Sequence, residues 1–211
     1  MLIFFFRSSS LKQSVFKSKS QKIGINSKSN MTSKIGLQLY KYAFKYPKTI
    51  FFQNNDDLQL FSNLKLAEAN SCDVLPGSGV DLEKFAYSPK IETDKIVFLM
   101  ISRILYDKGV VEYVDAAREI KSIYKNVEFQ LLGSYDDSKG SIPFLEFEKW
   151  KKENNINYLG VTDSVSDKIK NADCVVLPSY REGTPKTLLE SLSIGRPIIT
   201  TDTAGCKETV I

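Results

Sequence analysis

The sequence contains no histidine, and its three cysteines, Cys72, Cys174 and Cys206, lie far apart. No C-x-x-C pair is present, so the sequence indicates neither a disulfide framework nor a zinc site. No group of Cys, Asp or Glu has the spacing of metal ligands, and a site that depends on a metal is therefore not expected. The cysteine usage is that of a protein from a reducing, cytoplasmic compartment.

Acidic residues are absent from residues 1–55, which carry ten Lys or Arg, so the rest of the chain has 19 basic and 25 acidic residues, a balance of −6. Long apolar runs are also absent, because Met1–Phe6 is too short for a signal peptide or a membrane span. Residues 8–34 are rich in Ser and Lys, so residues 1–33 are expected to be disordered. A transit peptide is the alternative. The folded part shows no basic stripe with interleaved aromatic residues, and no nucleic acid partner is expected.

Residues 34–46 have the pattern of a basic amphipathic helix. Its apolar face is formed by Ile35, Leu39, Tyr42 and Tyr46, and its basic face by Lys34, Gln38, Lys41 and Lys45. Such a helix either packs on a protein core or lies on an anionic membrane surface. A strand is expected at 49–53, followed by a helix that Asn55 and Asp56 cap.

From residue 95 onward, short apolar runs alternate with amphipathic segments. Strands are expected at 96–102, 127–133, 156–160 and 174–177, and helices at 109–124, 144–153 and 163–171. This alternation predicts an α/β fold with a doubly wound parallel sheet. The glycines of residues 75–85, LPGSGVDLEKF, predict a tight turn between two domains.

Residues 174–200, CVVLPSYREGTPKTLLESLSIGRPIIT, form a strand–loop–helix–strand unit around which the chain is organised. Thr184 is expected to cap the helix, with Pro185 as its first residue and Gly195 at its end. The residues expected on its buried face are Leu188, Leu189, Leu192 and Ile194. The loop leaves the carboxyl end of a parallel strand and leads into a helix start, which is a favourable place for a phosphate.

Two carboxylates, Glu182 and Glu190, flank this helix start, eight positions apart. Carboxylates accept hydrogen bonds from the paired hydroxyls of a sugar or a ribose. Alternatively, Glu182 is a solvated acid favoured by the helix dipole, and residues 187–190 match a capping box. A capping box there conflicts with Pro185, which would place Thr187 inside the helix.

Arg103 and Lys108 follow the first strand of the same predicted sheet. Both loops open on the carboxyl edge of that sheet, so these two cations can neutralise a diphosphate bound there. By itself a basic pair in a loop is usually a solvated surface feature. No D-x-D motif is present, which argues against a metal-bridged diphosphate.

Four segments together resemble motifs of retaining glycosyltransferases of the family-4 type, which have the two-domain GT-B fold. Residues 181–190 resemble the E-x7-E motif, residues 102–109 the G-R-x4-K-G loop, residues 75–85 the interdomain crossover, and residues 200–211 the G-G-x-x-E-x-V segment. Within that family, the chain is similar to bacterial enzymes that extend polyprenyl-diphosphate-linked glycans for surface polysaccharides.

The resemblance implies a nucleotide-sugar donor, UDP-N-acetylhexosamine or UDP-hexose, no cofactor, and a lipid-linked saccharide acceptor. It implies a catalytic role for Glu182 and donor binding by Arg103, Lys108, Gly183, Thr184, Leu188, Leu189 and Glu190. It also implies four regions: residues 1–33, a remnant of the acceptor domain at 34–74, the crossover at 75–89 and the donor domain at 90–211.

Compared with a full family member, the chain is expected to be a fragment that lacks most of the acceptor domain and the last strand and helices. Two alternatives remain open beside an active transferase. One is a fragment that only binds the nucleotide-sugar, and the other is an unrelated doubly wound domain with a different phosphate ligand. A cytoplasmic protein at the inner face of the plasma membrane is expected.

Overall fold

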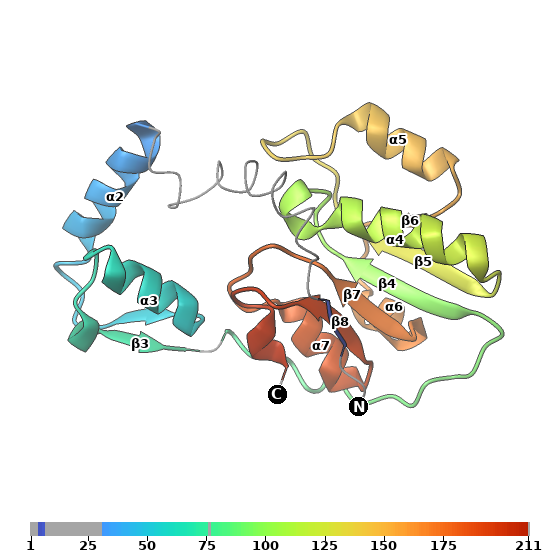
Figure 1. The fold of residues 1–211 in the computed structure, drawn as a ribbon. Helices are drawn as coiled ribbons and strands as arrows, with labels where there is room; N and C mark the ends of the chain where they lie inside the picture. Colours follow the sequence, from blue (N-terminus) through green and yellow to red (C-terminus); the bar gives the residue numbers. More distant parts are fainter. Residues whose placement is uncertain (1–3, 7–30, 76, 211) are drawn as a thin grey trace. The chain divides into compact units, whose positions relative to one another are not determined.

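A computed structural model describes residues 4–6, 31–75 and 77–210. It divides into two compact units, one formed by residues 79–211 together with the N-terminal strand, and one within residues 7–78. Figure 1 shows the elements of each unit. Most of the segment 1–33 that the sequence predicts to be disordered lies outside the described residues. The exceptions are Phe4–Phe6, which form a short strand, and residues 31–33, which begin a helix.

The larger unit is built on a six-stranded sheet with the order β1-β8-β7-β4-β5-β6. Its strands are β1 (Phe4–Phe6), β4 (Ile96–Ile101), β5 (Val127–Leu132), β6 (Asn157–Gly160), β7 (Cys174–Leu177) and β8 (Ile198–Thr201), and all neighbours pair in parallel. Its helices are α4 (Val110–Ile123), α5 (Phe144–Lys152), α6 (Val165–Asn171) and α7 (Lys186–Ile194), with short 3-10 turns η2 (Tyr106–Lys108) and η3 (Lys207–Thr209). The predicted doubly wound parallel sheet is confirmed.

The chain reverses its direction across the sheet at β4. From β4 it adds β5 and then β6 on one side, and afterwards β7 and β8 on the other. Since such crossovers are right-handed, the helices of the two halves cover opposite faces, and Figure 1 shows α4 and α5 on one face and α6 and α7 on the other. Ligands of doubly wound sheets bind at the carboxyl ends of the strands beside this reversal, which here means the ends of β4 and β7.

Apolar side chains from both faces of the sheet form one core. Leu99 and Met100 of β4 and Leu131 of β5 are fully buried, as expected of strands covered on both sides. Tyr113 of α4 is also buried, and its hydroxyl lies 2.9 Å from the carbonyl oxygens of both Phe98 and Gln130. This phenol therefore ties the first helix to the two central strands without leaving its own polar atom unpaired.

The smaller unit contains α2 (Met31–Ala43), β2 (Ile50–Phe52), α3 (Asn55–Asn63), the turn η1 (Ala69–Ser71) and β3 (Cys72–Val74), with β2 and β3 parallel. Its core is formed by Ile50, Phe52, Phe61 and Leu66. The cap of α3 is Asn54, whose Oδ1 accepts a hydrogen bond from the Asp57 amide at 2.8 Å. The sequence prediction that Asn55 and Asp56 are the caps is wrong by one residue, because Asn54 has the extended backbone of a cap residue while Asn55 is already helical.

Helix α2 packs on this core through a face other than the predicted one. Tyr40 and Phe44 lie against the ring of Phe61, with centroids 5.4 and 5.8 Å away. By contrast, the four residues of the predicted apolar face are each more than half exposed: Ile35, Leu39, Tyr42 and Tyr46. Periodicity identified an apolar stripe correctly but did not show which side of the helix the core covers. Over the range that the structure describes, no helix combines the length and apolar character needed to cross a membrane.

The segment after the unit boundary is bound firmly to α7. Ser193 Oγ donates to the Phe85 carbonyl at 2.7 Å, the Ser88 amide donates to the Ile194 carbonyl at 3.1 Å, and Arg196 Nη1 donates to the Ser88 carbonyl at 2.8 Å. Gly77 and Gly79 both have positive φ, a conformation that glycine adopts without strain. The boundary between the units falls at residues 78 and 79, beside these glycines, and residues 85–88 belong to the larger unit.

Candidate functional site

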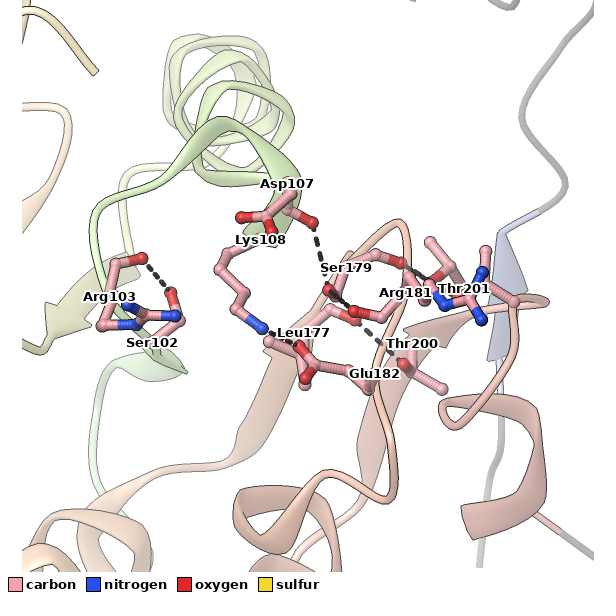
Figure 2. A network of polar contacts seen from close by, with 11 residues as sticks. Ser102, Arg103, Asp107, Lys108, Leu177, Ser179, Arg181, Glu182, Thr200 and Thr201 are labelled. Carbon is pink, nitrogen blue, oxygen red and sulfur yellow. Dashed lines mark hydrogen bonds and ion pairs between the residues drawn. The ribbon is translucent and has the colours of Figure 1, made fainter. Parts of the chain in front are cut away.

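The loops that follow β4 and β7 lie side by side at the carboxyl edge of the sheet (Figure 2). The carbonyl of Asp107 accepts a hydrogen bond from the Tyr180 amide at 2.9 Å, and Ser179 Oγ lies 3.1 Å from the same oxygen. Gly109 has φ 75°, and a Cβ there would lie 2.2 Å from the carbonyl oxygen of Pro178. The two loops therefore approach too closely for any residue but glycine at this position.

A third loop, after β8, supports the β7–α7 loop from its other side. The Glu182 amide donates to the Ala204 carbonyl at 3.0 Å, and a Cβ on Gly205 would lie 2.3 Å from the Glu182 carbonyl oxygen. Thr200 Oγ1 donates to the Leu177 carbonyl at 2.9 Å, and Thr203 Oγ1 donates to the Ser179 carbonyl at 3.1 Å. Contacts on both sides thus fix the loop that carries Glu182.

Lys108 and Glu182 form an ion pair between these loops. Lys108 Nζ lies 2.7 Å from Glu182 Oε1, and the two side chains are 17% and 16% exposed. The sequence predicted Lys108 as a contact of the diphosphate and Glu182 as a contact of the sugar. It did not predict that the two side chains pair with each other. Because each carries the opposite charge to the other, the centre of the site is neutral before any ligand arrives.

Arg103 stands at the end of β4, exposed to solvent. Hydrogen bonds from Ser138 hold the pKa of Asp136 below its ordinary value, and the nearby charge of Arg103 adds a smaller effect in the same direction. In the part of the chain that the structure describes, the Arg103 guanidinium has neither an ion pair nor a hydrogen bond with another side chain. Its fork of donors is thus available at the edge where the site lies.

Helix α7 begins at Lys186, with Pro185 as its cap residue. The prediction of Thr184 as the cap and Pro185 as the first helical residue is wrong by one position, because Pro185 keeps an extended ψ of 106° and its carbonyl accepts the amides of Leu188 and Leu189. The predicted end is confirmed, since Gly195 is left-handed with φ 91°. Gly183 and Thr184 lie half-buried in the loop directly before the helix.

The starts of α4 and α7 share one property. No side chain caps either of them, and the cap residues are Gly109 and Pro185, which have no side-chain acceptor. The first amides of a helix have no partner inside the helix, and with the helix dipole they favour an anion. Two helix starts without a cap therefore open at the same edge of the sheet.

Glu190 lies on α7 and is only 9% exposed. Burial raises the pKa of its carboxyl group, and the charges of Lys186 and Lys84 partly oppose this effect. In the described range the carboxylate takes part in no hydrogen bond and no ion pair. A partly buried acid without a partner costs folding free energy, so its presence needs an explanation other than stability.

The other predicted residues of α7 have different positions. Leu188 is fully buried in the core, and its amide already donates to Pro185. Leu189 is half-buried. Among the predicted residues, the structure thus pairs Lys108 with Glu182. Arg103 and Glu190 have no side-chain partner among the described residues. Leu188 packs the helix onto the core.

Sequence reasoning missed two polar residues of this region. Tyr180 donates a hydrogen bond from its hydroxyl to Glu112 Oε1 at 2.7 Å, which links the β7–α7 loop to the first turn of α4. Ser179 is fully buried between the loops. Both residues lie in the stretch that the sequence singled out, but a partner 68 positions away follows no spacing rule.

A cavity of about 530 Å³ lies at the opposite, amino-terminal edge of the sheet and is lined by Lys95, Lys121, Lys125 and Lys151. Helices α4 and α5 end beside it, and lysines at helix C-termini complement the negative end of the dipole. We assign no site to this cavity, because its charges are explained by the helices around it.

Comparisons with known proteins show what the chain is similar to. A family model described as "Glycosyl transferases group 1" matches residues 82–211. The chain is 31% identical over 196 residues to the N,N'-diacetylbacillosaminyl-diphospho-undecaprenol alpha-1,3-N-acetylgalactosaminyltransferase of Campylobacter jejuni, with 87% of this chain and 50% of that protein covered. It is 24% identical to the UDP-Gal:alpha-D-GlcNAc-diphosphoundecaprenol alpha-1,3-galactosyltransferase of Escherichia coli, with 78% and 45% covered.

Solved structures share the fold. The structure of HepE from Anabaena in complex with UDP and glucose superposes with a TM-score of 0.69 at 16% identity, covering 85% of this chain and 51% of that one. WaaG, a glycosyltransferase of lipopolysaccharide biosynthesis, gives a TM-score of 0.69 at 18% identity, with 96% and 57% covered. These likenesses confirm the predicted fold, the Rossmann-like half of a GT-B protein. The chain spans about half the length of the curated relatives it matches.

Proposed function

Because the chain belongs to the glycosyl transferases group 1 family, we propose that its larger unit binds a nucleotide-sugar donor, UDP-N-acetylhexosamine or UDP-hexose. The sugar is then transferred, with retention of its anomeric configuration, to a polyprenyl-diphosphate-linked saccharide in surface glycan assembly. The observation that carries this proposal is the pair of helix starts without caps, α4 and α7, beside Arg103 and Lys108 at one edge of the sheet. The relatives named above act on diphospho-undecaprenol-linked sugars.

In this proposal the diphosphate lies over the two helix starts. Their free amides and the side chains of Arg103 and Lys108 neutralise its charge, so that no metal cofactor is required. Lys108 is already 2.7 Å from Glu182, and it can contact a phosphate oxygen while it remains close to that carboxylate. As the bond to the sugar breaks, negative charge grows on the leaving diphosphate, and donors placed there beforehand stabilise it.

The two carboxylates have different roles. Glu182 is held between three loops at the centre of the site, and we assign it to the donor sugar as the catalytic carboxylate. Glu190 has no side-chain partner in the described range, and we assign it to the ribose hydroxyls, which donate hydrogen bonds in pairs. Gly183 and Thr184 shape the loop between them, while Leu188 and Leu189 hold the helix under the nucleotide.

Calorimetric titration with UDP tests the proposal. Arg103→Ala removes a charged hydrogen bond to the diphosphate, so it is expected to cost about 1.5–3 kcal/mol, or roughly a tenfold to hundredfold loss of affinity. Lys125→Ala is the matched control, because it removes one positive charge at the opposite edge of the sheet. Equal affinities for the two variants would contradict the assignment.

The division of roles between the carboxylates requires two further variants. Glu190→Gln turns one acceptor into a donor without a change of shape, so it should weaken the binding of UDP itself. Glu182→Gln should weaken UDP-sugar more than UDP, since the sugar is its proposed contact. If both variants weaken UDP equally, the two roles are wrongly assigned.

A second candidate function is binding of the nucleotide-sugar without transfer. Transfer requires in addition that the acceptor is held against the donor, which supplies much of the rate, and the residues assigned above contact the donor alone. An assay with UDP-sugars and a polyprenyl-diphosphate-linked acceptor separates the two. Turnover at about 1 s⁻¹ or more, which is ordinary for an enzyme, would exclude the binding-only alternative.

A lipid-linked acceptor requires access to a membrane, and helix α2 is the element that we propose for peripheral contact with the inner face of the plasma membrane. Its exposed apolar stripe, which includes Leu39 and Tyr42, lies beside lysines such as Lys41 and Lys45. This is the pattern of a helix that binds anionic lipid. Leu39→Glu is expected to reduce sedimentation with anionic vesicles, and unchanged sedimentation would contradict this contact.

A further inference from the structure

Glu112 occupies the third position of α4, whose first residue is Val110. A glutamate at this position commonly reaches back and accepts hydrogen bonds at the start of its own helix. In α4 it does not, since the cap amide of Gly109 donates to the Tyr106 carbonyl at 3.2 Å and the Glu112 carboxylate accepts from Tyr180. The carboxylate that would naturally close this start is thus directed elsewhere.

Tyr180 holds this carboxylate. Its hydroxyl donates to Glu112 Oε1 at 2.7 Å, while Glu112 Oε2 is buried and accepts no hydrogen bond from any residue that the structure describes. The tyrosine is itself fixed, because its amide donates to the Asp107 carbonyl at 2.9 Å. Burial, and then the hydrogen bond with Glu112, raise the pKa of Tyr180, so the phenol keeps the proton that it donates.

A carboxylate with one unpaired oxygen is expected to turn toward free donors, and the first amides of its own helix are the nearest ones along the chain. At that place it would add a negative charge where the proposed diphosphate binds. The hydrogen bond from Tyr180 opposes this movement of the Glu112 carboxylate.

We propose that Tyr180 is a positioning residue that holds the Glu112 carboxylate away from the start of α4 and thereby keeps this helix start open for the diphosphate of the donor. The proposal rests on the proposed function of the same site. It assigns to Tyr180 an effect on phosphate binding that acts through Glu112, without contact between the tyrosine and the ligand.

The test is calorimetry of UDP binding to the full chain with Tyr180→Phe, Glu112→Gln and the double variant. Tyr180→Phe releases the carboxylate and is expected to weaken UDP about threefold to tenfold, the effect of one charge near a helix start. Adding Glu112→Gln removes that charge and is expected to restore the affinity to within about twofold of Glu112→Gln alone. Uridine carries no phosphate, so its binding should be the same with and without the tyrosine hydroxyl.

Several results overturn the inference. UDP affinity unchanged by Tyr180→Phe, no recovery in the double variant, or an equal loss for uridine would each show that Tyr180 only supports the loop. Thermal unfolding of each variant identifies a loss that comes from misfolding, and Glu112→Gln alone still reports on the charge in that case, since it should bind UDP at least as tightly as the unaltered chain. If the unaltered chain does not bind UDP, or if Arg103→Ala binds it equally well, the proposed function fails and this inference fails with it.

Discussion

Helices α3, α4 and α7 differ in what lies beside the free backbone amides at their starts. At α3 the Asn54 side chain accepts the Asp57 amide, and Asp56 and Asp57 add negative charge in the first turn. At α7 the cap is a proline, and the first turn contains no acid. At α4 the cap is a glycine, and the one acid of the first turn, Glu112, is held by Tyr180.

This contrast indicates where an anionic ligand is expected. A helix start closed by its own side chain has one of its free amides satisfied, which stabilises the helix. A start left open gives up this stabilisation, which is about 1 kcal/mol for a typical cap. The cap residues of α5 and α6 make no side-chain hydrogen bond either, so an open start alone does not mark a site. The starts of α4 and α7 differ in that Arg103 and Lys108 lie beside them in the larger unit, whereas the closed start of α3 belongs to the smaller unit. Four predictions test this comparison.

The largest effect is expected where the open start of α4 meets the β7–α7 loop. Gly109→Ala forces a side chain into a left-handed residue 2.2 Å from the Pro178 carbonyl oxygen, and it should lower the free energy of unfolding by about 3 kcal/mol or more. Gly160→Ala is the control, since its φ is also positive but nothing lies within 4 Å, so about 1–2 kcal/mol is expected. Denaturant unfolding followed by Trp150 fluorescence compares them, and equal losses would contradict close packing of the two loops.

Closing the start of α7 should have opposite effects on stability and binding. Pro185→Asp introduces a capping carboxylate, and relative to Pro185→Ala it should raise the free energy of unfolding by about 1 kcal/mol. The same change should weaken UDP about tenfold relative to Pro185→Ala, because it places a negative charge at the proposed phosphate position. A cap that stabilises the helix but leaves UDP affinity unaltered would mean that no phosphate binds there.

Opening the start of α3 is the converse experiment. Asn54→Ala removes the bond to the Asp57 amide and should destabilise the smaller unit by about 1 kcal/mol. Hydrogen exchange of the α3 amides measures the loss locally. UDP affinity should remain unaltered, and a change in it would show that a closed start also serves the site.

The smallest effect concerns the pH dependence of stability at Glu190. Burial raises the pKa of this carboxyl group, so the folded chain binds the proton more tightly than the unfolded chain does. The stabilisation that protonation provides is therefore complete below the ordinary glutamate pKa and is lost as the pH rises through the raised value. Glu190→Gln should remove this dependence and make the chain more stable at neutral pH while it weakens UDP. A steeper decline of stability with pH in the variant would contradict the burial effect.

Much of the site was predictable because its parts are local signals. The order of strands and helices and the loops after β4 and β7 follow from apolar periodicity. Arg103, Lys108, Glu182 and Glu190 were selected by their places in those loops and by the resemblance to family motifs, and their roles stay predictions. Helix boundaries were less certain. Asn54 and Pro185 each cap one residue away from the predicted boundary, since a cap depends on the backbone angles of one residue and several neighbouring residue types are compatible with the role.

The amino-acid pattern was enough to predict an α/β chain whose polar loops meet at the carboxyl edge of a parallel sheet, because apolar periodicity is a property of each segment and crossovers between parallel strands are right-handed. Three features required the folded chain: the pairing of Lys108 with Glu182, 74 positions away, the hydrogen bond from Tyr180 to Glu112, and the exposure of the apolar stripe of α2. Contacts between loops depend on how far each strand extends and where each glycine lets two backbones approach. These distances result from packing the whole sheet, and no spacing within one segment encodes them.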